Sequence, residues 1–180
     1  TMGHIRQLSE NLANKIAAGE VVERPASVIK ELTENSIDAN AKSITILVEQ
    51  GGTSKMCVID DGIGMNRADA LLCFSRHATS KIVDENDLFN ITTLGFRGEA
   101  IPSIASISVF TLETNNGEEN TKVEYEFGKR KNVGSVAMNR GTKITVERIF
   151  QNVPARLKYM KSINAEFAAI YSYVERLALA

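Results

Sequence analysis

The sequence has few of the features that mark secreted, membrane-spanning and metal-framework proteins. Its 180 residues include only two cysteines, Cys57 and Cys73, too few for a disulfide framework or a zinc cluster. No apolar run approaches the length that crosses a bilayer. There is also no signal-peptide core, internal repeat or low-complexity segment. Together these absences favour a reducing, cytosolic setting.

An excess of charge of one sign is lacking too. The net charge of −1 gives no global electrostatic argument for nucleic-acid binding, and we interpret the basic run Lys129–Lys131 as a solvated turn. The phosphate-binding pattern G-x-x-x-x-G-K-[ST] is missing, which excludes an ordinary P-loop enzyme. What the composition does supply is 43% hydrophobic residues, enough for one globular domain with a substantial core.

The stretch around which the chain is organised is Lys30–Ala39, which we interpret as part of a helix. Pro25 suits the first turn of this helix, and we expect its end between residues 38 and 40. At about 100° per residue, Glu31, Asn35 and Asp38 fall within about 60° of one another. Because this polar stripe borders apolar positions, we expect it to line a cavity. The simpler alternative is an amphipathic helix with polar edges.

The rest of the chain predicts further helices and strands. A helix is expected over residues 8–19, capped by Ser9 and ended by Gly19. Residues 43–49 and 56–59 predict an antiparallel hairpin of two central strands. Other strands are expected over 106–114, 121–127, 133–138 and 142–149, and other helices over 66–74, 100–104, 154–161 and 164–180. In the last helix Phe167, Ile170, Val174 and Leu177 share one face.

Three segments carry polar residues and glycines where binding sites are common. Asp60–Met65 directly follows a predicted strand, although a tight turn is the simpler explanation. Residues 75–93 show no clear period, which is typical of a lid, and include the possible phosphate donors of Arg76–Lys81. Leu94–Ala100 brings glycines to the mouth of a helix, where backbone N–H groups favour an anion. A flexible loop before a helix would explain this last segment equally well.

These pieces fit the chemistry of a nucleotide site. A Glu beside an Asn on one helix can activate water and hold Mg²⁺, which takes few protein ligands and completes its shell with phosphate oxygens and water. An Asp at a strand end can accept a hydrogen bond from the exocyclic amine of adenine. Glycines after it leave room for a flat ring.

Four blocks of the sequence resemble the N-terminal ATPase region of the MutL DNA mismatch-repair proteins, relatives of gyrase B, the Hsp90 chaperone and the histidine kinases. These blocks are Ile16–Pro25, Arg76–Lys81, Leu94–Ala100 and Pro154–Arg156. The resemblance spans almost the whole chain, and its details are similar to MutL from Gram-positive bacteria. It departs from the family at Asp61, where many relatives have Asn, and at Ile101, where Leu is usual. We expect Asp61 to face away from the base.

The resemblance implies an α/β (α+β) fold, in which a mixed, largely antiparallel sheet carries helices on one face as a two-layer sandwich. It implies ATP or ADP and Mg²⁺ as ligands, with Glu31 as general base and Asn35 as the Mg²⁺ ligand. Asp60 would recognise adenine, with Gly64 beneath the ring and Thr142 supporting through water. The implied nucleotide-binding residues are Asn35, Ala39, Asp60, Gly64, Met65, Thr79, Ser80, Lys81, Leu94, Gly95, Phe96, Arg97, Gly98, Glu99, Ala100 and Thr142.

The resemblance also implies a role. The expected function is ATP binding and slow Mg²⁺-dependent hydrolysis that gates dimerisation and partner coupling in DNA mismatch repair, in the bacterial cytoplasm at the nucleoid and away from membranes. The implied partners are a second MutL subunit, the mismatch-recognition protein MutS and, for the full-length protein, DNA. Because Leu177–Ala180 is apolar and lacks a helix-stop signal, we expect residues 1–180 to be the ATP-binding domain of a longer chain, with weak turnover by itself.

Some alternatives stay open at this stage. The chain could be a nucleotide-dependent clamp in which turnover is incidental. A histidine kinase is disfavoured, because His4 and His77 lie on no suitable helix. Arg24 has a purely structural interpretation as the ion-pair partner of Glu23, and Arg156 has one as a ligand of an internal carboxylate.

Overall fold

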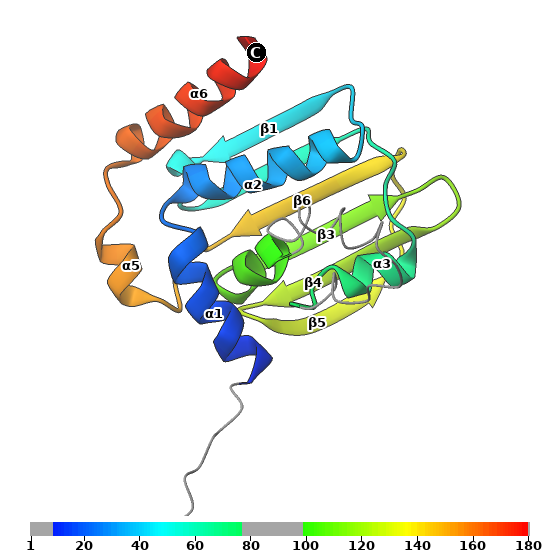
Figure 1. Cartoon of the computed structure of the whole chain (residues 1–180), viewed down its shortest axis with the longest axis horizontal. Coiled ribbons are helices and arrows are strands. Elements are labelled where there is room, and N and C mark those ends of the chain that lie inside the picture. The colour runs from blue at the N-terminus through cyan, green and yellow to red at the C-terminus, as the bar shows by residue number, and fades with distance from the viewer. Residues whose placement is uncertain (1–8, 77–98, 180) are drawn as a thin grey trace, which may run out of the picture.

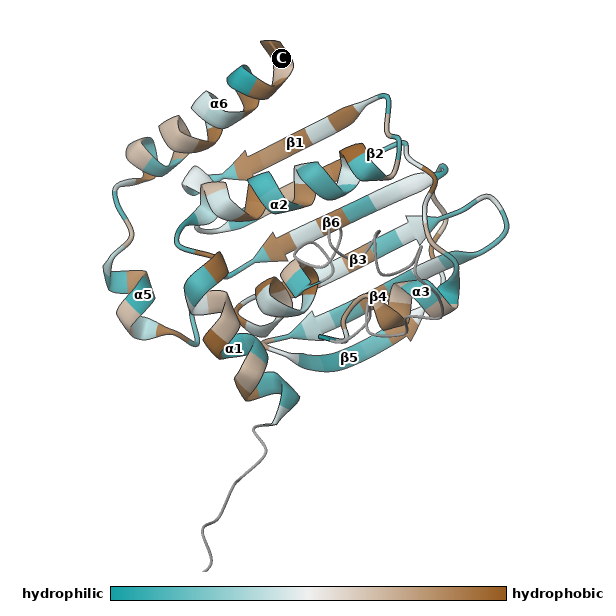
Figure 2. Cartoon of the chain, viewed as in Figure 1, coloured by the Kyte–Doolittle hydropathy of each residue, from teal (hydrophilic) through white to brown (hydrophobic). Residues whose placement is uncertain are grey.

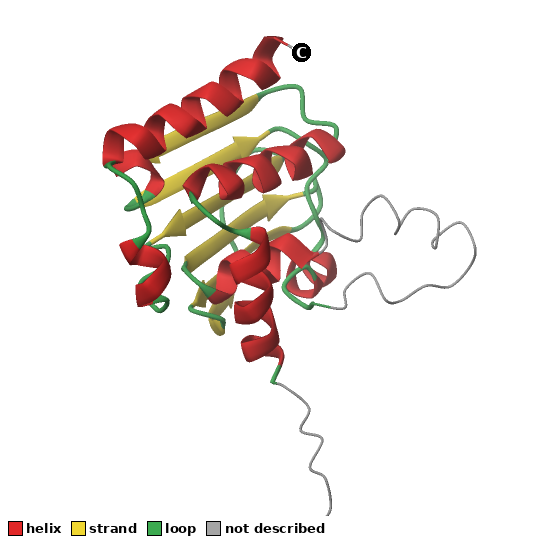
Figure 3. Ribbon diagram, turned by 60° about the vertical axis from the view of Figure 1, so that its left-hand side comes forward, coloured by secondary structure: helices red, strands yellow, loops and turns green. Residues whose placement is uncertain are grey.

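The computed structural model describes residues 9–76 and 99–179, which form a two-layer α+β sandwich (Figures 1 and 3). One layer is a six-stranded sheet in the order β1-β2-β6-β3-β4-β5, and the other consists of helices packed on one face of that sheet. Every described strand pair is antiparallel, which sharpens the expected mixed, largely antiparallel sheet. Within the described ranges no helix is both long and apolar enough to cross a membrane.

The elements have the following bounds. The strands are β1 (Ile44–Glu49), β2 (Lys55–Asp60), β3 (Val109–Asn115), β4 (Asn120–Glu126), β5 (Lys129–Gly134) and β6 (Gly141–Glu147). The helices are α1 (Glu10–Val21), α2 (Pro25–Asp38), α3 (Arg67–Leu72), α5 (Pro154–Lys158) and α6 (Ile163–Leu179), with a 3-10 turn η1 (Gln50–Gly52) and a further helical segment over 99–106.

Helix α2 forms as the sequence predicts and buries one face against the sheet. Pro25 occupies its first turn, where a missing backbone N–H costs nothing. Val28, Ile29 and Leu32 are fully or almost fully buried, and Ser36 continues that face one turn later. Burying side chains of this size stabilises the fold by about 1.5–3 kcal/mol each. The buried face therefore fixes the direction in which the polar stripe of α2 points.

Helix α1 differs from its predicted extent. The Ser9 side chain accepts a hydrogen bond from the N–H of Leu12, as expected of a cap. The helix then continues through Gly19 to Val21, so the predicted end at Gly19 is wrong. Continuing the helix brings Val22 into the core, and the Gly19 carbonyl accepts a hydrogen bond of 2.7 Å from Arg156 Nη2. Arg156 thus contacts a backbone carbonyl rather than the internal carboxylate of the structural interpretation.

Two strand predictions are wrong in position. β1 lies at an edge of the sheet instead of at its centre, and its residue Leu47 is 53% exposed. Lys129–Lys131 lies in the edge strand β5, not in a turn, and the strand predicted over 133–138 ends at Gly134. The chain reverses instead at residues 127–128, where Phe127 has a positive φ of 47°. In Figure 2 strand β5 is hydrophilic along most of its length, as suits a strand with one open edge.

Helix α6 is attached to the domain by a partly buried ion pair. Arg24, just before α2, donates to Glu166 Oε1 through Nε at 3.2 Å and Nη2 at 2.5 Å. Glu166 is 1% exposed, so Arg24 pairs with a buried carboxylate and not with Glu23. Ile170 is buried, whereas Phe167, which was expected to share its face, is 49% exposed. The ion pair takes a position on α6 that an apolar side chain would otherwise occupy.

Removing Arg24 should therefore destabilise the fold. Arg24→Ala leaves the Glu166 carboxylate buried without its cation, which we expect to cost about 3 kcal/mol. The free energy of unfolding from urea titration measures this loss. Arg67→Ala is the control, because Arg67 is exposed and its side chain has no ion pair within the described residues; we expect a change within about 0.5 kcal/mol. Equal losses in the two variants would contradict a stabilising role for the pair.

Candidate functional site

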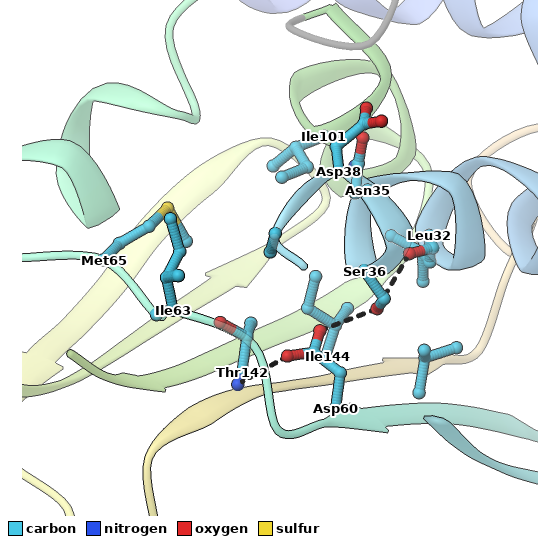
Figure 4. Close-up of a pocket in the computed structure, with 13 residues that line it drawn as sticks. Leu32, Asn35, Ser36, Asp38, Asp60, Ile63, Met65, Ile101, Thr142 and Ile144 are labelled. Atoms are coloured by element: carbon cyan, nitrogen blue, oxygen red, sulfur yellow. Dashed lines mark hydrogen bonds between the residues drawn. The ribbon is translucent and has the colours of Figure 1, made fainter. Parts of the chain in front are cut away.

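A cavity of about 430 Å³ lies between α2 and the adjacent ends of β2 and β6 (Figure 4). Most of its wall is apolar, with a few polar groups converging on one end, the usual composition of a small-molecule site. The apolar lining residues are Leu32, Val58, Ile63, Met65, Ile101 and Ile144, the polar ones are Asn35, Ser36, Asp38, Asp60 and Thr142, and Ala39 and Gly64 complete the wall.

Asp60, the last residue of β2, places a carboxylate in this apolar wall and is only 9% exposed. Its Oδ1 accepts two backbone hydrogen bonds, from the N–H of Gly62 at 2.9 Å and from that of Thr142 at 3.2 Å. Its Oδ2 accepts one hydrogen bond, from the Ser36 hydroxyl at 2.6 Å. Each carboxylate oxygen has about two lone-pair positions. Oδ1 is therefore saturated, and Oδ2 keeps one position for a donor in the cavity.

The loop after Asp60 depends on close backbone approaches. Gly64 has φ +71°, and a Cβ on it would lie 2.0 Å from the carbonyl oxygen of Asn115. Gly141 has φ +135°, and a Cβ there would lie 2.0 Å from the carbonyl oxygen of Asp60. A side chain fits at neither position. These contacts hold the loop against β3 and bring the start of β6 beside Asp60.

Thr114 connects the loop after Asp60 to β6 by hydrogen bonds. This fully buried side chain on β3 accepts a hydrogen bond from the N–H of Met65 at 2.9 Å. Its hydroxyl also lies 3.0 Å from that of Thr142 and 3.3 Å from the carbonyl oxygen of Gly141. Thr114 thereby orients two cavity residues without lining the cavity itself.

Asp61, next to Asp60, faces the other way, as expected. Its Oδ1 accepts hydrogen bonds from the backbone N–H groups of Lys42 at 2.8 Å and Ser43 at 2.9 Å. These bonds, that of Ser43 first, hold the pKa of the Asp61 carboxyl below its usual value. Consecutive acids thus have different surroundings, one facing the cavity and one capping the start of β1.

Known proteins resemble this chain over the region that contains the cavity. The family model of the histidine kinase-, DNA gyrase B- and HSP90-like ATPases matches residues 23–159, which include α2, β2 and β6. This chain belongs to that ATPase family. The family match covers all residues that line the cavity.

Within this ATPase family the chain is similar to bacterial DNA mismatch repair proteins MutL, which confirms the resemblance. It is 55% identical over 180 residues to MutL of Halalkalibacterium halodurans and 57% identical over 180 residues to MutL of Geobacillus kaustophilus. Each alignment covers 99% of this chain, but only 28% and 29% of those relatives. The chain therefore spans less than a third of the length of the proteins that it matches.

Solved structures agree with the family assignment. The Aquifex aeolicus MutL ATPase domain complexed with ADP matches with a TM-score of 0.66 at 28% identity, over 88% of this chain and 56% of that one. The N-terminal domain of a DNA repair protein matches with a TM-score of 0.74 at 27% identity, over 90% of this chain and 47% of that one. Both contain more chain than residues 1–180.

Many of the residues predicted for nucleotide binding in this ATPase fold come together. Asn35, Ala39, Asp60, Gly64, Met65 and Thr142 all line the cavity. Asn35 and Asp38 do so from the predicted stripe of α2, and Glu31 lies one turn before Asn35, half-buried and outside the lining. The stripe thus borders a cavity, so the simpler amphipathic reading of α2 is not needed.

The remaining predicted residues are placed differently. Glu99 is within 4.0 Å of Arg76, and Ala100 is buried in the core, so neither lines the cavity. Thr79, Ser80, Lys81, Leu94, Gly95, Phe96, Arg97 and Gly98 lie outside the described residues.

Two residues that matter to the geometry, Ser36 and Thr114, were not singled out as site residues. A buried Ser on the apolar face of α2 is the only sequence signal for the first. Thr114 could be singled out only from the fold, because its role depends on the pairing of Thr114 with Thr142 between β3 and β6.

Ser36 should stabilise the fold through Asp60. Ser36→Ala removes a charge-assisted hydrogen bond from a buried carboxylate, and we expect a loss of about 1.5–3 kcal/mol in unfolding free energy. Ser27→Ala is the matched control, because Ser27 lies on the same helix and its side chain makes no hydrogen bond with the described residues. Both changes alter helix propensity alike. Urea titrations in which both variants lose the same stability would disprove the role assigned to the Ser36 bond.

Proposed function

We propose that this chain binds ATP and ADP in the cavity at Asp60 and hydrolyses ATP slowly with Mg²⁺, as the ATPase domain of a MutL-type DNA mismatch-repair protein. The observation that carries the proposal is the single open acceptor position on Asp60 Oδ2, inside an apolar cavity of an ATPase-family fold. The similarity to MutL supplies the biological setting.

The cavity suits an adenine ring. Its apolar wall, with Met65 and Ile144 among its residues, offers surfaces for a flat aromatic group. The exocyclic amine of adenine is an N–H donor that matches the open position on Asp60 Oδ2. Guanine carries a carbonyl oxygen at the equivalent ring position, and a carboxylate repels it. The same carboxylate that orients adenine therefore disfavours guanine.

The phosphates would extend along α2 towards Asn35. In the part of the chain that the structure describes, no group of three or more His, Cys, Asp or Glu side chains could hold a metal. A site with one protein oxygen from Asn35 suits Mg²⁺, whose other ligands are then phosphate oxygens and water. Bound there, Mg²⁺ would neutralise charge on the phosphates. The remaining phosphate donors of this proposal are backbone and side-chain groups of Thr79–Lys81 and Leu94–Ala100.

Glu31 is the proposed general base. It lies one turn before Asn35 on α2, where a carboxylate can take a proton from water as that water attacks the γ-phosphorus. The bond from the γ-phosphorus to the bridging oxygen breaks, and ADP leaves with the electron pair. General-base help of this kind is worth about 10²–10⁴ in rate. After this step Glu31 carries the proton that it took from the water.

The proposal includes the cellular role. The nucleotide state would gate dimerisation with a second MutL-type subunit and coupling to MutS and DNA. Because the chain spans only 28% of the Halalkalibacterium relative, those partners would engage the longer protein, and we expect residues 1–180 alone to turn over ATP weakly.

Asp60→Asn should abolish ADP binding. The two backbone N–H groups at Oδ1 keep an oxygen there, so the amide nitrogen takes the place of Oδ2 and faces the adenine amine donor to donor. The lost contact costs about 1.5–3 kcal/mol, and the facing donors add repulsion. Calorimetric titration with ADP measures the effect. Asp61→Asn is the matched control and should bind ADP as the wild type does, because Asp61 faces away from the cavity. Wild-type affinity in Asp60→Asn would refute the adenine assignment.

Glu31→Ala should separate binding from turnover. Asn35 and Asp60 are unchanged, so the affinity for Mg-ATP should stay within about tenfold, or 1.4 kcal/mol. Hydrolysis should fall by about 10²–10⁴, to background. Phosphate release under single-turnover conditions measures the rate, and Glu23→Ala, at an exposed acid outside the cavity, is the control. Turnover by Glu31→Ala at the wild-type rate would show that another group is the base.

A further inference from the structure

A second cavity of about 300 Å³ lies between α2 and α6 and shares no lining residue with the cavity at Asp60. These two helices run side by side along one side of the sheet (Figure 1). The cavity is lined by the cationic residues Arg24, Lys30 and Arg176 and by the hydroxyl-bearing residues Ser27, Ser172 and Tyr173, together with two alanines. We call it the basic pocket.

The cations of the basic pocket differ in their surroundings. Arg24 is fixed by its ion pair with the buried Glu166. Lys30 and Arg176 are exposed, and neither forms an ion pair with another described residue. The whole chain has a net charge of −1, so this unneutralised pair is a local feature of the surface. Among the residues that the structure describes, no carboxylate lines the pocket.

The hydroxyl groups of the pocket are available as donors. Within the described residues, the side chains of Ser27, Ser172 and Tyr173 make no hydrogen bond. Burial raises the pKa of the Tyr173 phenol, and the carboxylates of Glu34 and Glu31 raise it further, so the phenol stays protonated at neutral pH. Those two acids lie beside Lys30 on α2, at the end of the pocket away from Arg24.

Positive charge combined with O–H donors is the chemistry that binds phosphate oxygens. The cavity is open, and Lys30 and Arg176, which pair with no other described residue, are exposed. This suits a phosphate on a chain that passes over the surface more than a small anion that must be enclosed. We propose that the basic pocket binds a phosphodiester group of a DNA strand; the choice of DNA rests on the proposed function in mismatch repair.

The test is the salt dependence of DNA binding. Fluorescence anisotropy of a fluorescein-labelled single-stranded oligonucleotide gives the binding constant over a series of salt concentrations. Each cation that neutralises a phosphate of single-stranded DNA contributes about 0.7 to the slope of log K against log salt. Lys30→Gln combined with Arg176→Gln should lower that slope by about 0.7 for each cation. Lys129→Gln combined with Lys131→Gln removes the same charge from the exposed strand β5 and should leave the slope unchanged.

ADP titration of the same samples separates this proposal from the proposed function. Both double variants should bind ADP as the wild type does, because none of the four residues lines the cavity at Asp60. If the wild type does not bind ADP, the proposed function is contradicted, but the DNA-binding result still stands. Equal slopes in the two double variants, or no binding of the oligonucleotide by the wild type at low salt, would overturn the basic pocket. Binding of inorganic phosphate that depends on Lys30 and Arg176, without binding of the oligonucleotide, would overturn the DNA assignment.

Discussion

The carboxylate of Asp60 is the constraint on which the described site depends. It lies at the end of β2 and accepts hydrogen bonds from α2 through Ser36, from its own loop through Gly62 and from β6 through Thr142. An ionised carboxylate with so little exposure to water is stable only when its oxygens find donors. Meeting that need draws one helix and two strands together. The same arrangement leaves one lone-pair position of Oδ2 available to a donor in the cavity.

Glycines allow the backbone around the carboxylate of Asp60 to make the close approaches that the site needs. Gly141 lets β6 begin against the carbonyl of Asp60, and Gly64 lets the loop pass against Asn115. Thr114 then connects the loop to β6 through a buried hydroxyl. Polar groups at such positions are costly when unpaired, so the network rigidifies the wall of the cavity as long as it is complete. A rigid wall lowers the entropy lost when a ligand binds.

Charge is divided between the two sides of α2. The side towards β2 and β6 offers acceptors, with Asp60 beyond it, whereas the side towards α6 offers the cations of the basic pocket. The partly buried pair of Arg24 with Glu166 is the link, since it attaches α6 beside α2 and thereby creates that second cavity. Different faces of α2 thus line two separate cavities.

Much of this domain was predictable from local sequence. The extent of α2, the cap of Ser9, the β1–β2 hairpin and the helical character of the chain's end follow from short-range rules, and all are confirmed. The errors lie where those rules are weak. Strand position was wrong for β1, because alternation within a strand does not say which neighbours it has. The β5 strand was displaced, because its charged residues resemble a turn in composition and form a strand only through pairing with β4.

The sequence by itself determined which residue types are present and how α2 and the strand ends space them. Glu31, Asn35 and Asp60 were singled out in this way, and four other blocks of the sequence indicated the family. Only the tertiary structure decided that Ser36 and Thr142 donate hydrogen bonds to Asp60, that Asp61 turns to the start of β1, and that Arg24 meets Glu166 across 142 positions. The physical reason is that helix and strand periods act over a few residues. Which donor satisfies a buried charge depends on groups that meet only when distant segments pack.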